Sequence, residues 1–124
     1  MRDIQTRADL ELIMGLFYQK LLSDDTISYI FTDVAKINLA EHLPHIVNFW
    51  EQNLLGTAKY SNNVLKIHLD LNDKVQLEPH HFQTWLMRLY TTVDANFEGE
   101  IAETMKTRAL SIATVMKIKI QNLN

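Results

Sequence analysis

Residues 79 to 97 read PHHFQTWLMRLYTTVDANF, and this stretch indicates the fold class more clearly than any other. Pro79 fits the first position of a helix, where the N–H that proline lacks is not needed. Apolar side chains then recur every three or four residues, which is the period of an α-helix with one inward face. The stretch therefore predicts a long helix whose inward stripe comprises Phe82, Trp85, Leu86, Leu89, Val93 and Phe97.

The last quarter of the chain predicts a second long helix. Gly99 separates the two, and acidic residues gather at the start of the second helix while lysines lie near its end, as the helix macrodipole favours. Its apolar residues again recur at helical spacing. They are Ile101, Met105, Ala109, Ile112, Ala113, Met116 and Ile120.

The N-terminal part predicts another helix with a clear start and end. Thr6 followed by Asp9 is a helix start signal, because both side chains can accept the free N–H groups of the first turn. The sequence SDDT at 23–26 ends the helix, and the apolar residues around Phe31 predict a brief helix after it. The inward stripe of the first helix comprises Leu10, Ile13, Met14, Phe17 and Leu21.

The region EHLPHIVNFW at 41–50 predicts a helix with an unusual first turn. Asn38 followed by Glu41 is similar to a capping box. Pro44 removes one hydrogen bond from the first turns. We therefore expect a distorted first turn, or a regular helix that begins near His42. The inward face is predicted from His42, Ile46 and Phe49 at positions i, i+4 and i+7, with Trp50 beside it.

Between Gly56 and Pro79 the sequence predicts two loops around one short helix. The short helix is NNVLKIHLDL at 62–71, which is amphipathic and has His68 near its centre. We find no pattern typical of a strand, a repeat or a low-complexity segment. The predicted architecture is all-α, with four substantial helices and two short ones in a single domain over residues 1–124.

Composition and charge exclude several classes of protein. The chain has 124 residues and a net charge of −3, so it offers no basic surface for nucleic acid or an anionic membrane. It has no cysteine, which excludes disulfides, thiolate metal sites and covalent haem attachment. The polar N-terminus and the lack of a long apolar run predict neither a signal peptide nor a membrane span. We expect a cytoplasmic globular protein.

Three polar-tipped side chains lie on faces that are otherwise predicted to point inward: Tyr18, His42 and Trp85. Each alone has an ordinary structural explanation, since buried tyrosine and tryptophan commonly use their polar atom in one hydrogen bond. Together with His68 they would also suit a bound planar cofactor. Haem iron takes a neutral imidazole as its axial ligand, and O–H or N–H donors on the opposite side would stabilise bound oxygen.

The sequence resembles the group III truncated (two-over-two) haemoglobins from about residue 8 to residue 120. The resemblance extends over most of the chain with few gaps, so it is more specific than any single short motif. It is carried by FYQKLL at 17–22, IFTDV at 30–34, EHLPHIVNFW at 41–50, LLGTAKYSNN at 54–63, HLDL at 68–71, HFQTWL at 81–86 and RALSIA at 108–113.

The resemblance implies a truncated globin-like helical sandwich around haem b, with His68 as the iron ligand. It implies that Tyr18 hydrogen-bonds bound oxygen, that Trp85 lies in the same distal pocket, and that His42 lies near the ligand entry route. The apolar residues implied to pack on or near the haem are Phe17, Phe31, Ile46 and Phe49. Lys66, with Tyr60, could approach a haem propionate, because a carboxylate favours a cation or a hydroxyl donor.

The function implied is the binding of O2, NO or other diatomic ligands at the iron. Two or three donors should slow oxygen release, which favours NO dioxygenation or peroxide cleavage with an electron-donating reductase over bulk oxygen transport. Two alternatives stay open: a ligand store or sensor without turnover, and a helical interaction module without haem. His42 and His45 without a third ligand make a weak metal site, so His45 is predicted to be solvent-exposed. His80 and His81, in the first turn after Pro79, are predicted to be packed or solvated.

Overall fold

The computed structural model describes residues 1–34, 38–56 and 78–123. Within these ranges the chain forms helices and no strand, which confirms the all-α class. The elements in chain order are α1 (Arg7–Leu22), the π-helical turn η1 (Ile30–Val34), α2 (Leu39–Leu54), α4 (Pro79–Asn96) and α5 (Glu100–Leu123). The predicted short helix around His68 lies outside the described residues.

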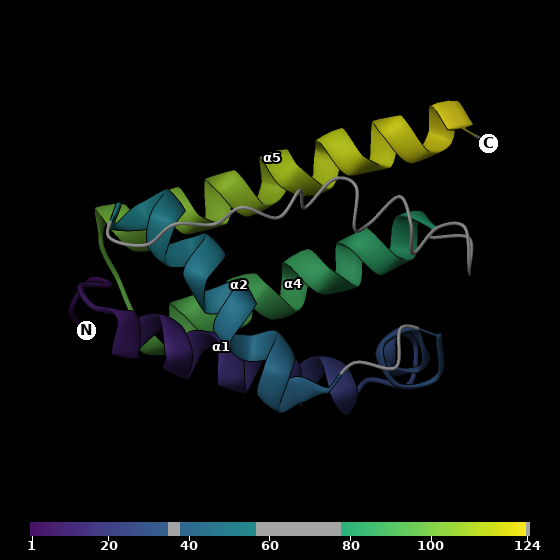
Figure 1. Ribbon diagram of the computed structural model, residues 1–124. Helices are drawn as coiled ribbons and strands as arrows, with labels where there is room; N and C mark the ends of the chain where they lie inside the picture. The colour runs from purple at the N-terminus through teal and green to yellow at the C-terminus, as the bar shows by residue number, and fades with distance from the viewer. Residues whose placement is uncertain (35–37, 57–77, 124) are drawn as a thin grey trace.

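Two helix pairs make up the fold (Figure 1). The helix α1 packs against α2 and α4, and α4 runs antiparallel to α5. As predicted, α1 begins after a capping box: the Asp9 N–H donates to Thr6 Oγ1 at 3.3 Å, and the Thr6 N–H donates to Asp9 Oδ2 at 3.0 Å. None of the helices in the described ranges is long and apolar enough to cross a membrane.

The start of α2 differs from the prediction. The helix is regular from Leu39, with Asn38 Oδ1 accepting the Ala40 N–H at 3.1 Å, so the expected shift of its start to His42 is wrong. Pro44 cannot donate to the carbonyl of Ala40, four residues earlier. Both residues are exposed, so water can reach that carbonyl and the helix tolerates the missing bond.

Burial separates two kinds of apolar residue. The whole predicted stripe of α1 is buried, as are Leu89 and Val93 in the second half of α4 and Phe97 directly after it. In contrast, the apolar residues of the first half of α4 and several on α2 are only partly buried. The partly exposed large apolar side chains therefore include Ile46 and Phe49 of α2 and Phe82, Trp85 and Leu86 of α4.

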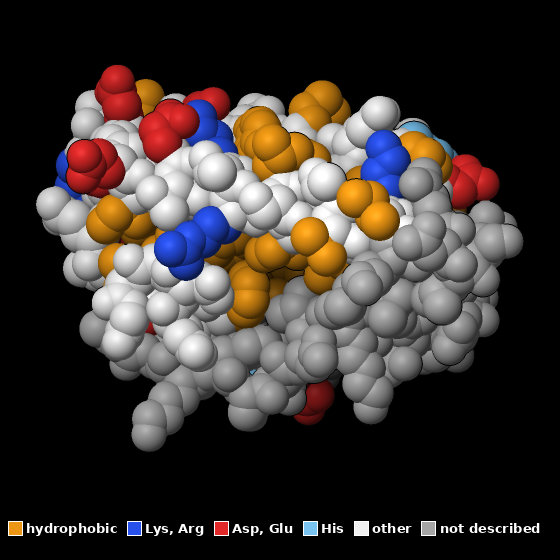
Figure 2. Space-filling model, turned by 90° about the horizontal axis from the view of Figure 1, so that it is seen from above, with side chains coloured by type: hydrophobic (Ala, Val, Ile, Leu, Met, Phe, Trp, Pro, Cys, Tyr) orange, Lys and Arg blue, Asp and Glu red, His pale blue; other side chains and the backbone are white. Residues whose placement is uncertain are grey.

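The outer side of α5 carries exposed apolar side chains among polar ones. Leu110, Val115 and Ile118 have exposed fractions of 48%, 49% and 52%, and separate apolar patches are visible on the face seen in Figure 2. The inner side of α5 carries mostly alanine and methionine, which allow α1 and α4 to pack nearby. The sequence pattern predicted only this inner stripe.

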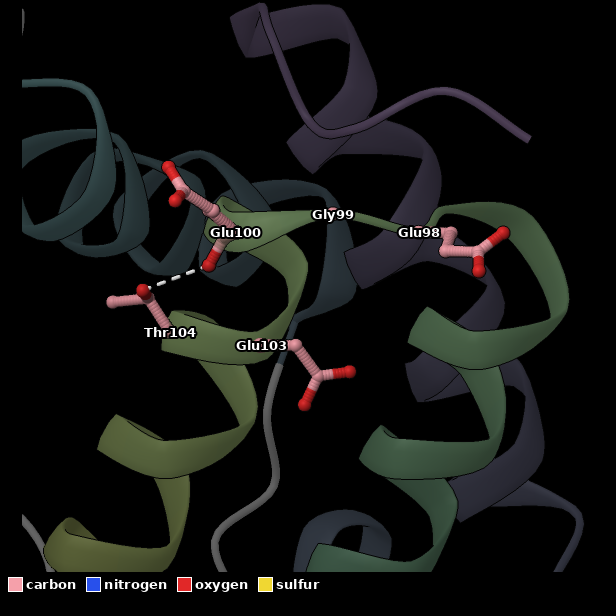
Figure 3. Close-up of a pocket in the computed structure, with 5 residues that line it drawn as sticks. All are labelled: Glu98, Gly99, Glu100, Glu103 and Thr104. Atoms are coloured by element: carbon pink, nitrogen blue, oxygen red, sulfur yellow. Dashed lines mark hydrogen bonds between the residues drawn. The ribbon is translucent and has the colours of Figure 1, made fainter.

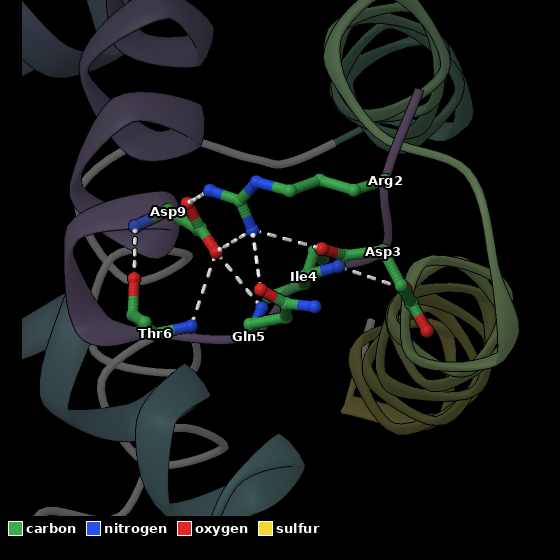
Figure 4. A network of polar contacts seen from close by, with 6 residues as sticks. All are labelled: Arg2, Asp3, Ile4, Gln5, Thr6 and Asp9. Carbon is green, nitrogen blue, oxygen red and sulfur yellow. Dashed lines mark hydrogen bonds and ion pairs between the residues drawn. The ribbon is translucent and has the colours of Figure 1, made fainter.

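The N-terminal segment ties the start of α1 to the start of α5. The Arg2 guanidinium donates two hydrogen bonds to the Asp9 carboxylate (Figure 4), and the Asp3 carboxylate accepts the N–H groups of Ile101 and Ala102 at 2.9 Å each. The bonds from Arg2 hold the pKa of Asp9 well below its usual 3.8. The stability that this carboxylate provides is therefore complete above pH 3.8 and is lost only as the pH falls below that value.

Gly99 is required at the junction of α4 and α5. Its φ of 149° is unfavourable for any residue with a side chain, and an added Cβ would lie 2.6 Å from Asp3 Oδ2. We expect Gly99→Ala to lower the free energy of unfolding by about 2–3 kcal/mol, from backbone strain together with loss of the Asp3 cap. Urea denaturation measures the change.

Gly15→Ala is the matched control, because Gly15 lies inside α1 and an added Cβ would have no atom within 4 Å apart from its chain neighbours and the backbone of its own helix. This substitution should raise the free energy of unfolding by about 0.5–1 kcal/mol, since alanine has less freedom to lose on folding. Equal effects at the two glycines would show that the contact between Gly99 and Asp3 does not contribute to stability.

Candidate functional site

The centre of the site is a contact between α1 and α2. Tyr18 Oη lies 2.7 Å from His42 Nε2, and the two rings meet edge to face with centroids 5.1 Å apart. Tyr18 is buried and His42 is half-buried. The imidazole of His42 therefore points toward Tyr18, which the sequence left open. Two titratable side chains 24 residues apart are joined by a short hydrogen bond.

Aromatic rings pack around this pair. The Tyr18 ring contacts Phe17 and Phe31, with centroids 5.3 and 5.8 Å apart. Phe17 in turn meets Trp85 of α4 at a centroid distance of 6.0 Å. The structure thus brings together five of the predicted site residues from α1, η1, α2 and α4. Edge-to-face packing fixes the orientation of these rings more narrowly than aliphatic contacts would.

The hydroxyl of Tyr18 is hydrogen-bonded to His42, whereas the indole N–H of Trp85 has no such partner among the described residues. Trp85 is partly exposed, and its indole N–H makes no hydrogen bond with any residue in the described ranges. An indole N–H can only donate. It is therefore a donor that a bound molecule could use without displacing a described partner.

Two further predicted residues extend the site along α2. Ile46 and Phe49 lie one and two turns after His42 on the same face, and both are partly buried against the core. Their neighbours Val47 and Trp50 are buried. The remaining predicted site residues, Lys66 and His68, lie outside the described residues, as does Tyr60.

The described residues fit a haem. A porphyrin needs apolar side chains to contact, and the partly exposed Phe31, Ile46 and Phe49 are side chains of this kind. A ligand on its iron needs O–H or N–H donors, and Tyr18 and Trp85 carry them. Cofactor sites are commonly lined by apolar and aromatic side chains with a few hydrogen-bond donors, as these residues are.

His81 is a buried histidine for which the sequence gave only a general expectation of packing or solvation. It is 4% exposed, the Glu78 N–H donates to its Nδ1 at 3.0 Å, and Tyr29 Oη lies 2.9 Å from its Nε2. Burial lowers its pKa, His80 lowers it further, and Glu78 acts in the opposite direction. Its position four residues before Trp85, on the inward stripe of α4, was the available sequence signal.

A separate acidic pocket lies where α4 joins α5. It is lined by Glu98, Gly99, Glu100, Glu103 and Thr104, and its carboxylates point in different directions (Figure 3). Thr104 Oγ1 donates to the Glu100 carbonyl at 2.8 Å. Nowhere in residues 1–34, 38–56 and 78–123 do three His, Asp or Glu side chains converge to hold a metal ion. The lining also includes no large apolar side chain that could contact a haem.

Comparison with known proteins agrees with the geometry, although no protein-family model matches the chain. The group 3 truncated hemoglobin ctb of Campylobacter jejuni is 30% identical over 105 residues, which are 82% of this chain and 80% of that protein. The crystal structure of a group III truncated hemoglobin from Campylobacter jejuni superposes with a TM-score of 0.85 at 25% identity, over 97% of this chain and 95% of that one. The predicted truncated-globin fold is confirmed. The chain belongs to the group 3 truncated haemoglobins.

Proposed function

We propose that this protein reacts with a diatomic ligand held beside Tyr18 and His42, and that it is not an oxygen carrier. Family membership makes it a globin-type haem protein that binds small diatomic ligands such as O2. The observation that carries the proposal is the 2.7 Å hydrogen bond between Tyr18 Oη and His42 Nε2, within an apolar site next to Trp85.

We assign the cofactor as haem b, because the chain has no cysteine for covalent attachment. His68 would hold the iron through its imidazole, and Phe17, Phe31, Ile46 and Phe49 would contact the porphyrin. Lys66 would pair with a propionate. The haem supplies an iron that binds the ligand and exchanges electrons with it.

The bond between Tyr18 and His42 can hold a proton in two arrangements. When His42 Nε2 carries the proton, it donates to Tyr18 Oη, and the tyrosine O–H is then able to donate to a ligand. When Nε2 is unprotonated, the tyrosine donates to the histidine instead. His42 thus controls whether Tyr18 can polarise the ligand, and a proton taken up by His42 can be passed to it.

Trp85 would add a second donor. Its N–H is not used by the described residues, and its ring is oriented by Phe17. A hydrogen bond to a charged group is worth about 1.5–3 kcal/mol, so two donors would slow the release of a negatively polarised ligand by several orders of magnitude. Slow release is unsuitable for transport and leaves time for a reaction.

The reactions that fit are NO dioxygenation and peroxide cleavage. In the first, NO, O2 and one electron give nitrate. In the second, hydrogen peroxide, two electrons and two protons give two molecules of water. Both need an electron donor, so we propose a reductase as partner, in the reducing cytoplasm that suits a chain without cysteine.

The test is repeated turnover. Oxygenated protein with an electron donor, such as reduced flavin and a flavin reductase, should consume many equivalents of NO or peroxide per haem. Tyr18→Phe should reduce the rate at least about tenfold, the effect of one hydrogen bond to a charged group. Consumption of a single equivalent would contradict the enzymatic proposal and favour a ligand store or sensor. A folded protein without a Soret band after haem addition would exclude both.

A further inference from the structure

The contact between His81 and Tyr29 requires a neutral histidine. The Glu78 N–H donates to His81 Nδ1 at 3.0 Å, so the ring proton lies on Nε2, which donates to Tyr29 Oη at 2.9 Å. His81 is 4% exposed. Both ring nitrogens are therefore engaged, one as acceptor and one as donor.

A second proton on His81 would break this arrangement. It would sit on Nδ1, facing the Glu78 N–H, and that hydrogen bond would be lost. Burial, the N-terminus of α4 and the His80 ring, whose centroid is 4.0 Å away, all disfavour a positive charge here. The Glu78 carboxylate favours it, but this exposed group also lies 3.3 Å from His80 Nδ1.

Tyr29 belongs to the segment that carries Phe31 to the Tyr18 ring. The described residues include two polar contacts between this segment and α4: the bond from His81 to Tyr29, and the ion pair of Arg88 with Asp24, 2.9 Å from Nη2 to Oδ2. Hydrogen bonds from Thr26 and Arg88 lower the pKa of Asp24, so the ion pair persists at mildly acidic pH. Only the contact of His81 depends on an ionisation near neutrality.

We infer that His81 is a positioning residue: as a neutral ring bonded to Tyr29 it holds Phe31 against Tyr18, and its protonation loosens the ligand site. The inference rests on the proposed function, because the effect is read from a ligand beside Tyr18. Its ordinary pKa is 6.5 and the folded value is lower. The stabilisation is therefore complete above about pH 6.5 and is lost as the pH falls below it. The stability that the Asp9 carboxylate provides is lost only at a much lower pH, below 3.8.

The first measurement concerns the ring itself. In the ferrous carbon monoxide complex, nitrogen NMR should show His81 with its proton on Nε2 at pH 7.5, and His81 should titrate below its ordinary pKa of 6.5. Tyr29→Phe removes only the hydroxyl and should change the Nε2 signal. Titration of His81 at or above pH 6.5, or a proton on Nδ1, would overturn the inference.

The second measurement concerns ligand release. Oxygen dissociation should become about two- to tenfold faster between pH 7.5 and pH 5.5, the effect of losing one neutral hydrogen bond. Tyr29→Phe should release oxygen faster already at pH 7.5, with a smaller further change in acid. His45→Gln, at an exposed histidine on α2, is the matched control and should keep the wild-type dependence on pH.

His42 is also an ionisable residue and touches Tyr18, so the pH series is repeated in His42→Leu. An acid effect that persists there supports His81 as its source, and an acid effect that disappears assigns it to His42 and overturns the inference. Unchanged release in Tyr29→Phe at pH 7.5 would also overturn it. Failure to take up haem would instead reject the proposed function, while the NMR titration of the haem-free chain would still decide whether His81 is held neutral.

Discussion

Replacing His68 by glycine is expected to lower haem affinity by at least about a hundredfold, since even loss of a group that only supports a metal ligand costs about 10- to 100-fold. The chain has no cysteine and no second histidine in the segment around His68 that could replace the ligand. Haem transfer to an excess of apomyoglobin measures the retention. The absorption spectrum should change at the same time, because the iron would lose an imidazole.

Free imidazole distinguishes loss of a ligand from damage to the fold. Glycine leaves space for the added molecule, so imidazole should restore the spectrum and much of the haem retention in His68→Gly. His45→Gly is a control at an exposed histidine on α2 and should retain haem. Unchanged haem affinity in His68→Gly would refute the assignment of the iron ligand and would direct the search to the other histidines.

The helices could be predicted because local sequence determines them. Thr6 and Asp9 form the capping box of α1, Pro79 opens α4, and Gly56 follows α2 with a φ of 71°. Each of these signals acts over a few residues. Pro44 misled the prediction because the cost of a missing hydrogen bond depends on whether water reaches the free carbonyl, and sequence does not report exposure.

The candidate site could be predicted only as a set of residues on inward faces. The bond between Tyr18 and His42 joins two helices, so its length depends on how they cross. Tyr29 and His81 are 52 residues apart and lie on segments with no shared pattern. A histidine on an apolar stripe signals a buried group, but its partner becomes known only from the packing of α4 against the η1 region.

Tyr18→Phe is expected to accelerate oxygen release by about ten- to a hundredfold, because it removes one hydrogen bond to a charged ligand. The phenyl ring keeps the contacts with Phe17 and Phe31, so haem should remain bound. Stopped-flow replacement of oxygen by carbon monoxide measures the rate. Tyr90→Phe is the matched control, since that hydroxyl donates to the Lys106 carbonyl at 3.2 Å between α4 and α5.

The double variant with His42→Leu tests whether Tyr18 and His42 act as one unit. If His42 orients the tyrosine O–H, its loss matters only while the hydroxyl is present. The effects of the two substitutions on the activation free energy of oxygen release should then be non-additive by about 0.5–3 kcal/mol. This is the usual range for residues joined by a hydrogen bond. Additive effects would mean that His42 acts on the ligand directly or on its entry. Unchanged release in Tyr18→Phe would transfer the main donor role to Trp85, whose N–H is not used by the described residues.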